Sequence, residues 1–432
     1  MRAAWVNWSR TWQCRPAAFE RPATRAELAA VVGRAAGPVR VAGAGHSFTP
    51  GALTSGTLLS LERLDHVLDA DPASGLVRVE AGISLHRLSR ELHFRGLALP
   101  NLGDIDAQSL AGALATGTHG TGARLPNLSA QVEAMELVLG DGSERVVDGG
   151  DLLRAARVGL GALGVVAAVT LRCVPAFRLR GVDEPQSLED VLATLDERAD
   201  AADHFEFWTF PHSPLALTRT NTRTEAPRQV PGRARAWLED VVVDNHVFGL
   251  VNRTARRFPR AIPALNRGAA RAASRRERVD WSFRIFASPR LVRFFEMEYA
   301  IPRERAAEAV RGAREILERH PVSFPIELRF VAGDDALLSP AHGRDSAYVA
   351  VHLFEGMPWQ DPFREVEALM STYGGRPHWG KWSFLGADEL APRYPAWDAF
   401  RAARAELDPE GRFANDWIRR VLGQRNVRPS PR

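Results

Sequence analysis

The chain has very little cysteine and no long apolar run. Cys14 and Cys173 are too few for a disulfide framework or for a cysteine-ligated metal or iron–sulfur site. The longest largely apolar stretch, Leu160–Leu171, is too short to cross a bilayer. The opening segment, Met1–Trp8, has polar breaks where a signal peptide needs a continuous apolar segment. We therefore expect a cytoplasmic protein without a transmembrane segment.

Lysine is almost absent. Lys381 is the single lysine, and every other residue in the Lys+Arg total of 56 is arginine. The net charge of +4 is compatible with nucleic acid or an anionic membrane as a partner, but an arginine-biased genome explains it more simply, so we expect no nucleic-acid partner. In a chain that uses arginine wherever a cation suffices, one lysine indicates a site that needs a compact ammonium.

The arginines are concentrated in one stretch. Arg253–Arg278 holds nine of them. This stretch could dock an electron-acceptor protein or a membrane surface, which leaves peripheral membrane association open. A solvated helical face is the simpler interpretation.

The first part of the chain alternates short helices and strands. Residues 24–36 have helical spacing behind Thr24 as N-cap, and Ser84–Arg95 is a predicted helix that ends at Gly96. The Asp141-Gly142 turn predicts a hairpin. We expect strands in this part over residues 39–42, 76–80, 132–139 and within 159–173.

From about residue 178 the pattern changes. Strands rich in aromatic residues are separated by amphipathic helices such as Arg303–Arg319, and Trp397–Leu407 is a further predicted helix. These strands are predicted over residues 204–210, 324–332 and 347–354. The length of 432 residues favours two or three domains, and no low-complexity linker separates them, so we expect them to pack tightly.

A glycine-rich turn, Gly43-Ala44-Gly45-His46-Ser47-Phe48, follows the first predicted strand. It is not a Rossmann fingerprint, because Phe48 replaces the third glycine and Pro50 argues against a helix starting there. What remains is a tight turn that exposes successive backbone N–H groups and suits a pyrophosphate.

Two further glycine clusters follow. Gly103–Gly122 combines glycines, threonine hydroxyls and a histidine, and Gly159–Val166 precedes a strand. Such segments bring backbone close to a ligand, although an ordinary glycine-rich loop explains either one taken alone.

In this order and spacing the three clusters resemble the vanillyl-alcohol-oxidase and p-cresol-methylhydroxylase superfamily of FAD proteins, and its aldonolactone oxidase branch most closely. The resemblance extends over essentially the whole chain. Its other motifs are Asn7-Trp8 with Cys14 and Pro16, Met297–Pro302, Phe324–Arg329 and His378-Trp379-Gly380-Lys381.

The resemblance implies a covalent cofactor. The histidine of the first turn is bonded to the flavin's 8α-methyl carbon in this branch, and His46 stands in that position as an exposed imidazole; the alternative is a hydrogen-bonding histidine beside a non-covalent flavin. The other implied cofactor contacts are Gly43, Ala44, Gly45, Ser47, Gly103, Asp104, Ser109, Gly112, Thr116, Gly117, His119, Gly120, Gly164 and Val165. Gly103 corresponds to a position where a small residue leaves room for dioxygen.

Glu327 and Arg329 lie two residues apart on a predicted strand, so both point to one face. Opposite charges on an inner strand face are costly unless they pair or meet a polar ligand. A surface salt bridge is the ordinary explanation, but the resemblance implies that the pair lines a sugar pocket. His352, on the next strand, could bind substrate hydroxyls or assist deprotonation, or be a structural histidine.

The resemblance also gives Lys381 a role. Hydride transfer places negative charge on the N1–C2 carbonyl edge of the flavin, and a cation placed there in advance stabilises the reduced form. Arg329 could share this task.

Together these observations predict an α+β fold of the p-cresol-methylhydroxylase type. Residues 1–178 and 378–432 would form the FAD-binding domain, and residues 179–377 an antiparallel-sheet cap domain. The expected reaction is oxidation of the C2 alcohol of an aldono-1,4-lactone to an ascorbate-type product, with dioxygen or a redox partner as electron acceptor and no metal. The alternative is an alditol or other carbohydrate oxidase with the same flavin.

Overall fold

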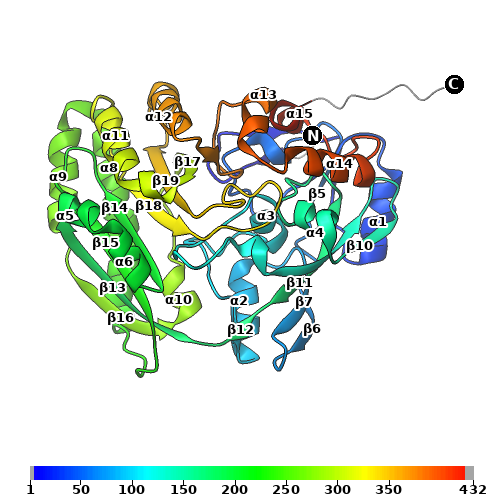
Figure 1. Cartoon of the computed structure of the whole chain (residues 1–432), viewed down its shortest axis with the longest axis horizontal. Helices are drawn as coiled ribbons and strands as arrows, with labels where there is room; N and C mark the ends of the chain where they lie inside the picture. The colour runs from blue at the N-terminus through cyan, green and yellow to red at the C-terminus, as the bar shows by residue number, and fades with distance from the viewer. Residues whose placement is uncertain (1–3, 424–432) are drawn as a thin grey trace.

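The computed structural model describes residues 4–423, so the first three residues of the opening segment and the last part of the predicted C-terminal segment, 424–432, lie outside it. The N-terminal elements and helices α13–α15 lie on one side of the molecule (Figure 1). A large antiparallel sheet with its helices lies on the other. The mixture of helices and mainly antiparallel strands confirms the predicted α+β class.

Two sheets form the N-terminal side. A five-stranded antiparallel sheet has the order β10 (Glu144–Val147), β9 (Val132–Val138), β11 (Val165–Arg172), β7 (Leu76–Glu80), β6 (Val67–Asp71). A three-stranded parallel sheet has the order β3 (Ala18–Glu20), β5 (Thr57–Leu59), β4 (Val39–Val41). The short pairs are β1 (Trp5–Val6) with β2 (Gln13–Cys14) and β12 (Val174–Pro175) with β8 (Leu97–Ala98).

Local sequence signals set the helix ends on this side. The helices are α1 (Arg25–Arg34), α2 (Leu85–Phe94), α3 (Leu110–Ala115) and α4 (Gly150–Arg157). The Thr24 and Ser84 side chains accept hydrogen bonds from the backbone N–H groups of Glu27 and Arg87 and so cap α1 and α2 as predicted. The predicted hairpin is also confirmed, since β9 and β10 pair across the Asp141-Gly142 turn.

The second part is built on an eight-stranded, fully antiparallel sheet. Its order is β16 (Arg276–Trp281), β13 (Arg178–Ser187), β15 (Leu215–Thr224), β14 (His204–Thr209), β18 (Ile326–Val331), β19 (Ser346–Phe354), β17 (Phe294–Pro302), β20 (Arg376–Pro377). The helices in contact with it are α5 (Leu188–Ala193), α6 (Leu195–Ala201), α9 (Ile262–Ala272), α10 (Ser282–Phe286), α11 (Ala306–Glu318) and α12 (Gln360–Thr372).

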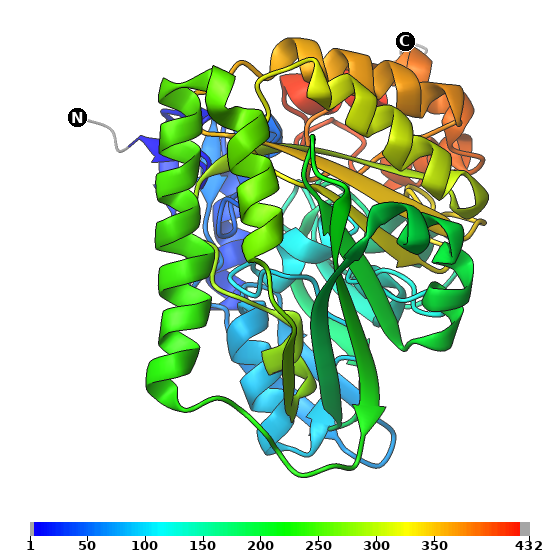
Figure 2. The same ribbon diagram turned by 90° about the vertical axis from the view of Figure 1, so that its left-hand side faces the viewer.

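A long helical rod lies at one end of this sheet (Figure 2). It runs without a break through α7 (Arg233–Trp237), the π-helical segment η3 (Leu238–Val247) and α8 (Phe248–Arg257), and α9 lies beside it. The arginine-rich stretch predicted as helix or loop thus spans the end of α8, all of α9 and the start of β16. No helix within residues 4–423 is both long and apolar enough to cross a membrane.

The chain finally returns to the N-terminal side. The helices there are α13 (Ala387–Leu390), α14 (Trp397–Leu407) and α15 (Asp416–Leu422). Helix α14 packs against α4, and α15 packs against η1 (Pro50–Ala52). The backbone N–H of Phe48 donates to the carbonyl of Gly380 at 2.7 Å, so the first glycine turn and the His378–Lys381 motif lie together.

Candidate active site

The molecule has two adjoining cavities. The larger, about 970 Å³, runs between the eight-stranded sheet and the glycine-rich segments of the N-terminal side. The smaller, about 340 Å³, lies behind the first glycine turn. Both are lined by His46, Ser47, Gln108 and Thr116, so these residues mark the junction. An elongated ligand could occupy both cavities and pass this junction.

The first glycine turn is open to a ligand. Among the described residues, the backbone N–H groups of residues 43–47 have no hydrogen-bond acceptor. A Cβ atom on Gly43 would lie 2.2 Å from Oγ of Ser109, so any larger residue there would push the turn away from α3. The free donors and the missing side chain fit the predicted pyrophosphate cradle.

His46 is half-buried, which corrects the prediction of an exposed imidazole. Its ring stacks on Trp8 with the ring centroids 5.3 Å apart. Burial, with the Lys381 ammonium, lowers the pKa of His46 to about 4, so the ring is neutral at physiological pH. Its Nδ1 atom is buried and has no hydrogen-bond partner. A neutral ring nitrogen without a partner is suited to act as a nucleophile or to meet a cofactor.

Most of the predicted site residues line these cavities. Those at the larger cavity are His46, Ser47, Gly103, Asp104, Thr116, His119, Glu327, Arg329, His352 and Lys381. Those at the smaller are Gly43, Ala44, Gly45, His46, Ser47, Ser109, Gly112, Thr116 and Gly164.

Gly117, Gly120 and Val165 line neither cavity. Gly120 packs against the backbone of Leu102 and the side chain of Asn101, and Val165 is buried within its sheet.

Gly103 has a packing reason to be glycine. A Cβ atom at this position would lie 3.1 Å from the carbonyl oxygen of His119. Even alanine would therefore press on the second glycine segment. This contact explains the glycine without reference to dioxygen.

A row of alternating charges crosses the sheet on the face toward the larger cavity. Asp183, Arg219, Glu206 and Arg329 are directly opposed on β13, β15, β14 and β18. Neighbouring side chains in the row pair at 2.7, 3.7 and 2.9 Å, and all four residues line the cavity or lie buried beside it. Because cross-strand pairs of opposite charge are favourable, this register places a rigid polar wall in the cavity.

Arg329 is held by three carboxylates. Its guanidinium lies 2.8 Å from Asp104, 2.9 Å from Glu206 and 2.5 Å from Glu327. Burial tends to raise the pKa of Asp104, but Arg329 and Arg290 outweigh it and lower that pKa. Burial raises the pKa of Glu206 to about 7, although Arg329 opposes the shift. The cluster thus fixes Arg329 in place and adds a contact from the N-terminal side of the molecule through Asp104.

His352 lies on β19 among acidic residues. Its Nε2 atom is 3.4 Å from Glu296 and 3.9 Å from Glu327. Its Nδ1 atom donates to the carbonyl of Pro325, so Nε2 is the atom that gains and loses a proton. Burial tends to lower the pKa of His352, but Glu296 and Glu327 outweigh it and raise that pKa above 6.5. The group is suited to accept a proton from a bound alcohol.

Lys381 lies at the junction of the larger cavity with the C-terminal segment. Its ammonium forms an ion pair with Glu296 and lies 5.2 Å from the ring centroid of Phe48. Burial would raise the pKa of Glu296, but Lys381 and His352 lower it, so this carboxylate is charged. Lys381 therefore has a fixed partner, which the sequence did not predict.

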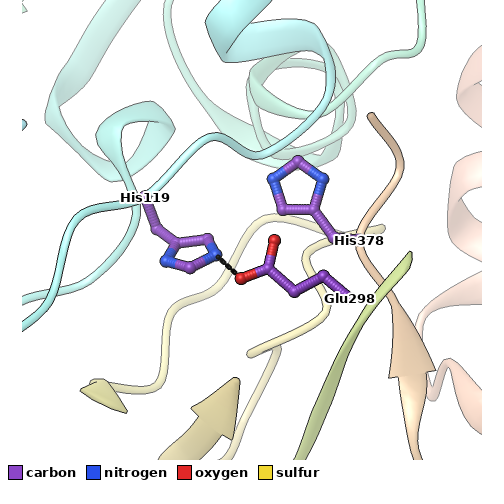
Figure 3. A group of neighbouring side chains, drawn as sticks. All are labelled: His119, Glu298 and His378. Carbon is purple, nitrogen blue, oxygen red and sulfur yellow. Dashed lines mark ion pairs between the residues drawn. The ribbon is translucent and has the colours of Figure 1, made fainter. Parts of the chain in front are cut away.

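A second buried acid, Glu298, lies between two histidines (Figure 3). Its carboxylate is 3.3 Å from Nε2 of His119, and His378 lies on its other side. The ring nitrogens are partly engaged, since Nδ1 of His119 donates to the carbonyl of Gly120 and Nδ1 of His378 accepts from the N–H of Gly380. Burial opposes ionisation of Glu298, but His119 lowers its pKa well below 4.5. The cluster joins the second glycine segment to the His378–Lys381 motif.

The sequence profile of the D-arabinono-1,4-lactone oxidase family matches residues 169–421. That of an FAD-binding domain matches residues 16–148. The chain belongs to the D-arabinono-1,4-lactone oxidase family.

Relatives that match the full length of the chain agree with this family assignment. The chain is 47% identical over 429 residues to an L-gulono-1,4-lactone dehydrogenase of Mycobacterium tuberculosis, covering 98% of this chain and 100% of the relative. It is 35% identical to an alditol oxidase of a Streptomyces species, covering 98% and 100%. The fold matches a solvent-stable cholesterol oxidase with a TM-score of 0.84 at 20% identity over 98% of this chain and 97% of that one. The predicted two-part FAD-binding fold is thereby confirmed.

The sequence analysis did not identify several acidic residues of the candidate active site. Glu298 lies in the family motif Met297–Pro302 and Glu296 directly precedes that motif, whereas Glu206 lies in a strand predicted from its aromatic residues. A signal was available, because these carboxylates stand in buried strands that are otherwise mainly apolar. Arg219 and Arg290 gave no such signal, since arginine is common throughout the chain.

Proposed function

We propose that this protein oxidises the C2 alcohol of an aldono-1,4-lactone of the L-gulono-1,4-lactone type to an ascorbate-type product. The observation that supports it best is the position of Glu327, Arg329 and His352 on one wall of a cavity that continues past His46 into the glycine cradle. The family match and the names of the full-length relatives support the same substrate class.

The residues present fit FAD. When bound, FAD supplies the group that accepts a hydride from the substrate carbon. The free N–H groups of residues 43–47 would hold the pyrophosphate. His46 would form a covalent bond to the cofactor through a ring nitrogen, for which the buried Nδ1 without a partner is the candidate atom.

The charged wall would bind and orient the lactone. Arg329 presents donors to a ring carbonyl or hydroxyl oxygen, and Glu327 accepts from hydroxyl groups. Because Arg329 is fixed by three carboxylates, little of its side-chain freedom remains to be lost on binding.

His352 would take the hydroxyl proton at Nε2. The resulting imidazolium faces Glu296 and Glu327, whose negative charges stabilise it. Lys381 supplies positive charge near the site, and its pairing with Glu296 keeps the ammonium in place before the reaction.

Cys14 and Cys173 are both unpaired, which supports a cytoplasmic location. The name of the mycobacterial relative, a dehydrogenase, supports an electron acceptor other than dioxygen.

An alditol oxidase is the second candidate, favoured by the Streptomyces relative. The two are separated by measuring kcat/KM for L-gulono-1,4-lactone, xylitol and sorbitol with the same artificial acceptor. We expect the lactone to be the best substrate. A higher kcat/KM for xylitol or sorbitol would replace the lactone proposal with the alditol one.

A further inference from the structure

The larger cavity has an apolar arm that a sugar lactone does not need. Beyond the charged wall it continues between the ends of β14 and β15 and the helices η3, α8 and α9. The residues that give the arm its character include Phe210, Leu217, Val247, Phe248, Val251 and Leu265. A polyhydroxylated lactone placed here would lose hydrogen bonds to water without replacing them, so the arm fits an apolar ligand.

The arm exists because α9 is built from small residues. Ala264, Gly268 and Ala269 face the cavity from this helix, which packs against β15. The acidic residues of η3 at the edge of the arm are already paired: Asp244 lies 3.0 Å from Arg276, and Asp240 lies 3.6 Å from Arg278. These pairs join η3 to β16 and leave mainly apolar groups to meet a ligand.

The arm opens at the surface of the helical rod. Val230, Val243 and Val247 line the cavity and are also 47, 41 and 47% exposed. Trp237 and Leu250, which belong to the same rod, are each 59% exposed. Most of the exposed large apolar side chains among residues 4–423 lie between residues 230 and 291, the part of the chain that contains the rod.

The rod and the helix beside it also carry unbalanced positive charge. Residues 245–274 contain six arginines and no aspartate or glutamate. Arg253, Arg257, Arg260, Arg267 and Arg271 are exposed, and no carboxylate of the described residues lies within ion-pair distance of them. Helices that expose apolar side chains together with arginines are typical of contact with an anionic bilayer.

We propose that the apolar arm binds a lipophilic quinone, which enters from an anionic membrane on which the helical rod rests and serves as the electron acceptor. This inference rests on the proposed lactone oxidation for its electron source. Each alcohol oxidised to a ketone releases two electrons and two protons. A quinone takes up two electrons and two protons to become a hydroquinone, so the balance closes without a further reactant.

The binding test uses the holoenzyme and decyl-benzoquinone, with Kd measured by titration calorimetry. Ala269→Phe narrows the arm, and Gly268→Phe is a second variant at a position where an added Cβ meets no atom within 4 Å. Ala402→Phe, at an exposed position on α14, is the matched control. We expect at least about tenfold weaker binding in both arm variants, a difference of ~1.4 kcal/mol, and no change in the control. Unchanged binding in both arm variants, or no binding to the unmodified enzyme, overturns the proposal.

Two half-reactions separate this inference from the proposed function. Anaerobic reduction by lactone should be the same in the arm variants, whereas reoxidation by decyl-benzoquinone should slow and reoxidation by ferricyanide should not. If the lactone fails to reduce the enzyme but the dithionite-reduced enzyme still shows arm-dependent reoxidation by the quinone, the lactone proposal fails and the quinone site stands. Reoxidation by quinone that is insensitive to both arm variants rejects the site.

The membrane contact is tested by sedimentation with vesicles. The enzyme should bind vesicles of phosphatidylglycerol and phosphatidylcholine, and bind pure phosphatidylcholine much less. Leu250→Glu should weaken this binding, whereas Val146→Glu, at a 58% exposed position on β10, should not. Equal binding by both variants, or no binding to the anionic vesicles, rejects the membrane route of entry.

Discussion

The ammonium of Lys381 forms an ion pair with the buried carboxylate of Glu296. Glu296 also lies 3.4 Å from Nε2 of His352, so one carboxylate positions both the single lysine of the chain and the candidate base. The effects of changing Lys381 or His352 can therefore be predicted.

Lys381→Met should slow flavin reduction by the lactone by about 10²-fold, because a preplaced charge near the reacting atoms is removed. The variant should also be less stable, since Glu296 would be left buried without its ammonium. Stopped-flow reduction and thermal unfolding measure the two effects. Arg145→Met, which removes an exposed cation, should change neither; an unchanged rate in Lys381→Met contradicts the role given to the ammonium.

His46→Ala should abolish covalent attachment of the cofactor. After acid precipitation the unmodified protein should give a yellow pellet, and the variant a colourless pellet under a yellow supernatant. His86→Ala, which changes an exposed histidine, should behave like the unmodified protein. A yellow pellet from His46→Ala would place the bond on another residue.

Gly43→Ala should weaken FAD binding, because the new Cβ would lie 2.2 Å from Oγ of Ser109. The double variant Gly43→Ala/Ser109→Ala relieves this contact and should bind FAD better than Gly43→Ala alone. Gly149→Ala is the control, since its Cβ meets no atom within 4 Å. FAD binding by the three variants is measured as the flavin-to-protein ratio after purification. If Gly43→Ala retains the ratio of the unmodified protein, the glycine cradle is not the FAD site.

The dependence of kcat/KM on pH should reflect the protonation of His352. A base acts only after it has lost its proton, so kcat/KM should rise with pH through a pKa above the usual 6.5. His352→Gln should lower kcat/KM and abolish its rise with pH. If kcat/KM of His352→Gln still rises with pH, another group is responsible for the rise. Glu206, whose pKa is raised to about 7, is the first candidate.

The sequence predicted elements whose signals are local. Thr24 and Ser84 cap their helices through their own side chains, and Glu327 and Arg329 share a face because strand side chains alternate. The sites that depend on register were not predictable. The row from Asp183 to Arg329 requires three strand pairings that no local pattern encodes, and the partner of Lys381 comes from a strand 85 residues away.

We infer that the charged wall at Glu327 and Arg329 presents a lactone to an FAD held by the glycine cradle. The most direct test is anaerobic addition of L-gulono-1,4-lactone to the purified protein and to Glu327→Gln, with the flavin absorbance followed in time. We predict rapid bleaching of the unmodified protein, and bleaching slowed by at least about 10²-fold in a variant that retains its full flavin content. Equal bleaching of the two proteins would show that Glu327 does not act on the lactone, and a flavin that the lactone does not reduce at all would show that the lactone is not the substrate.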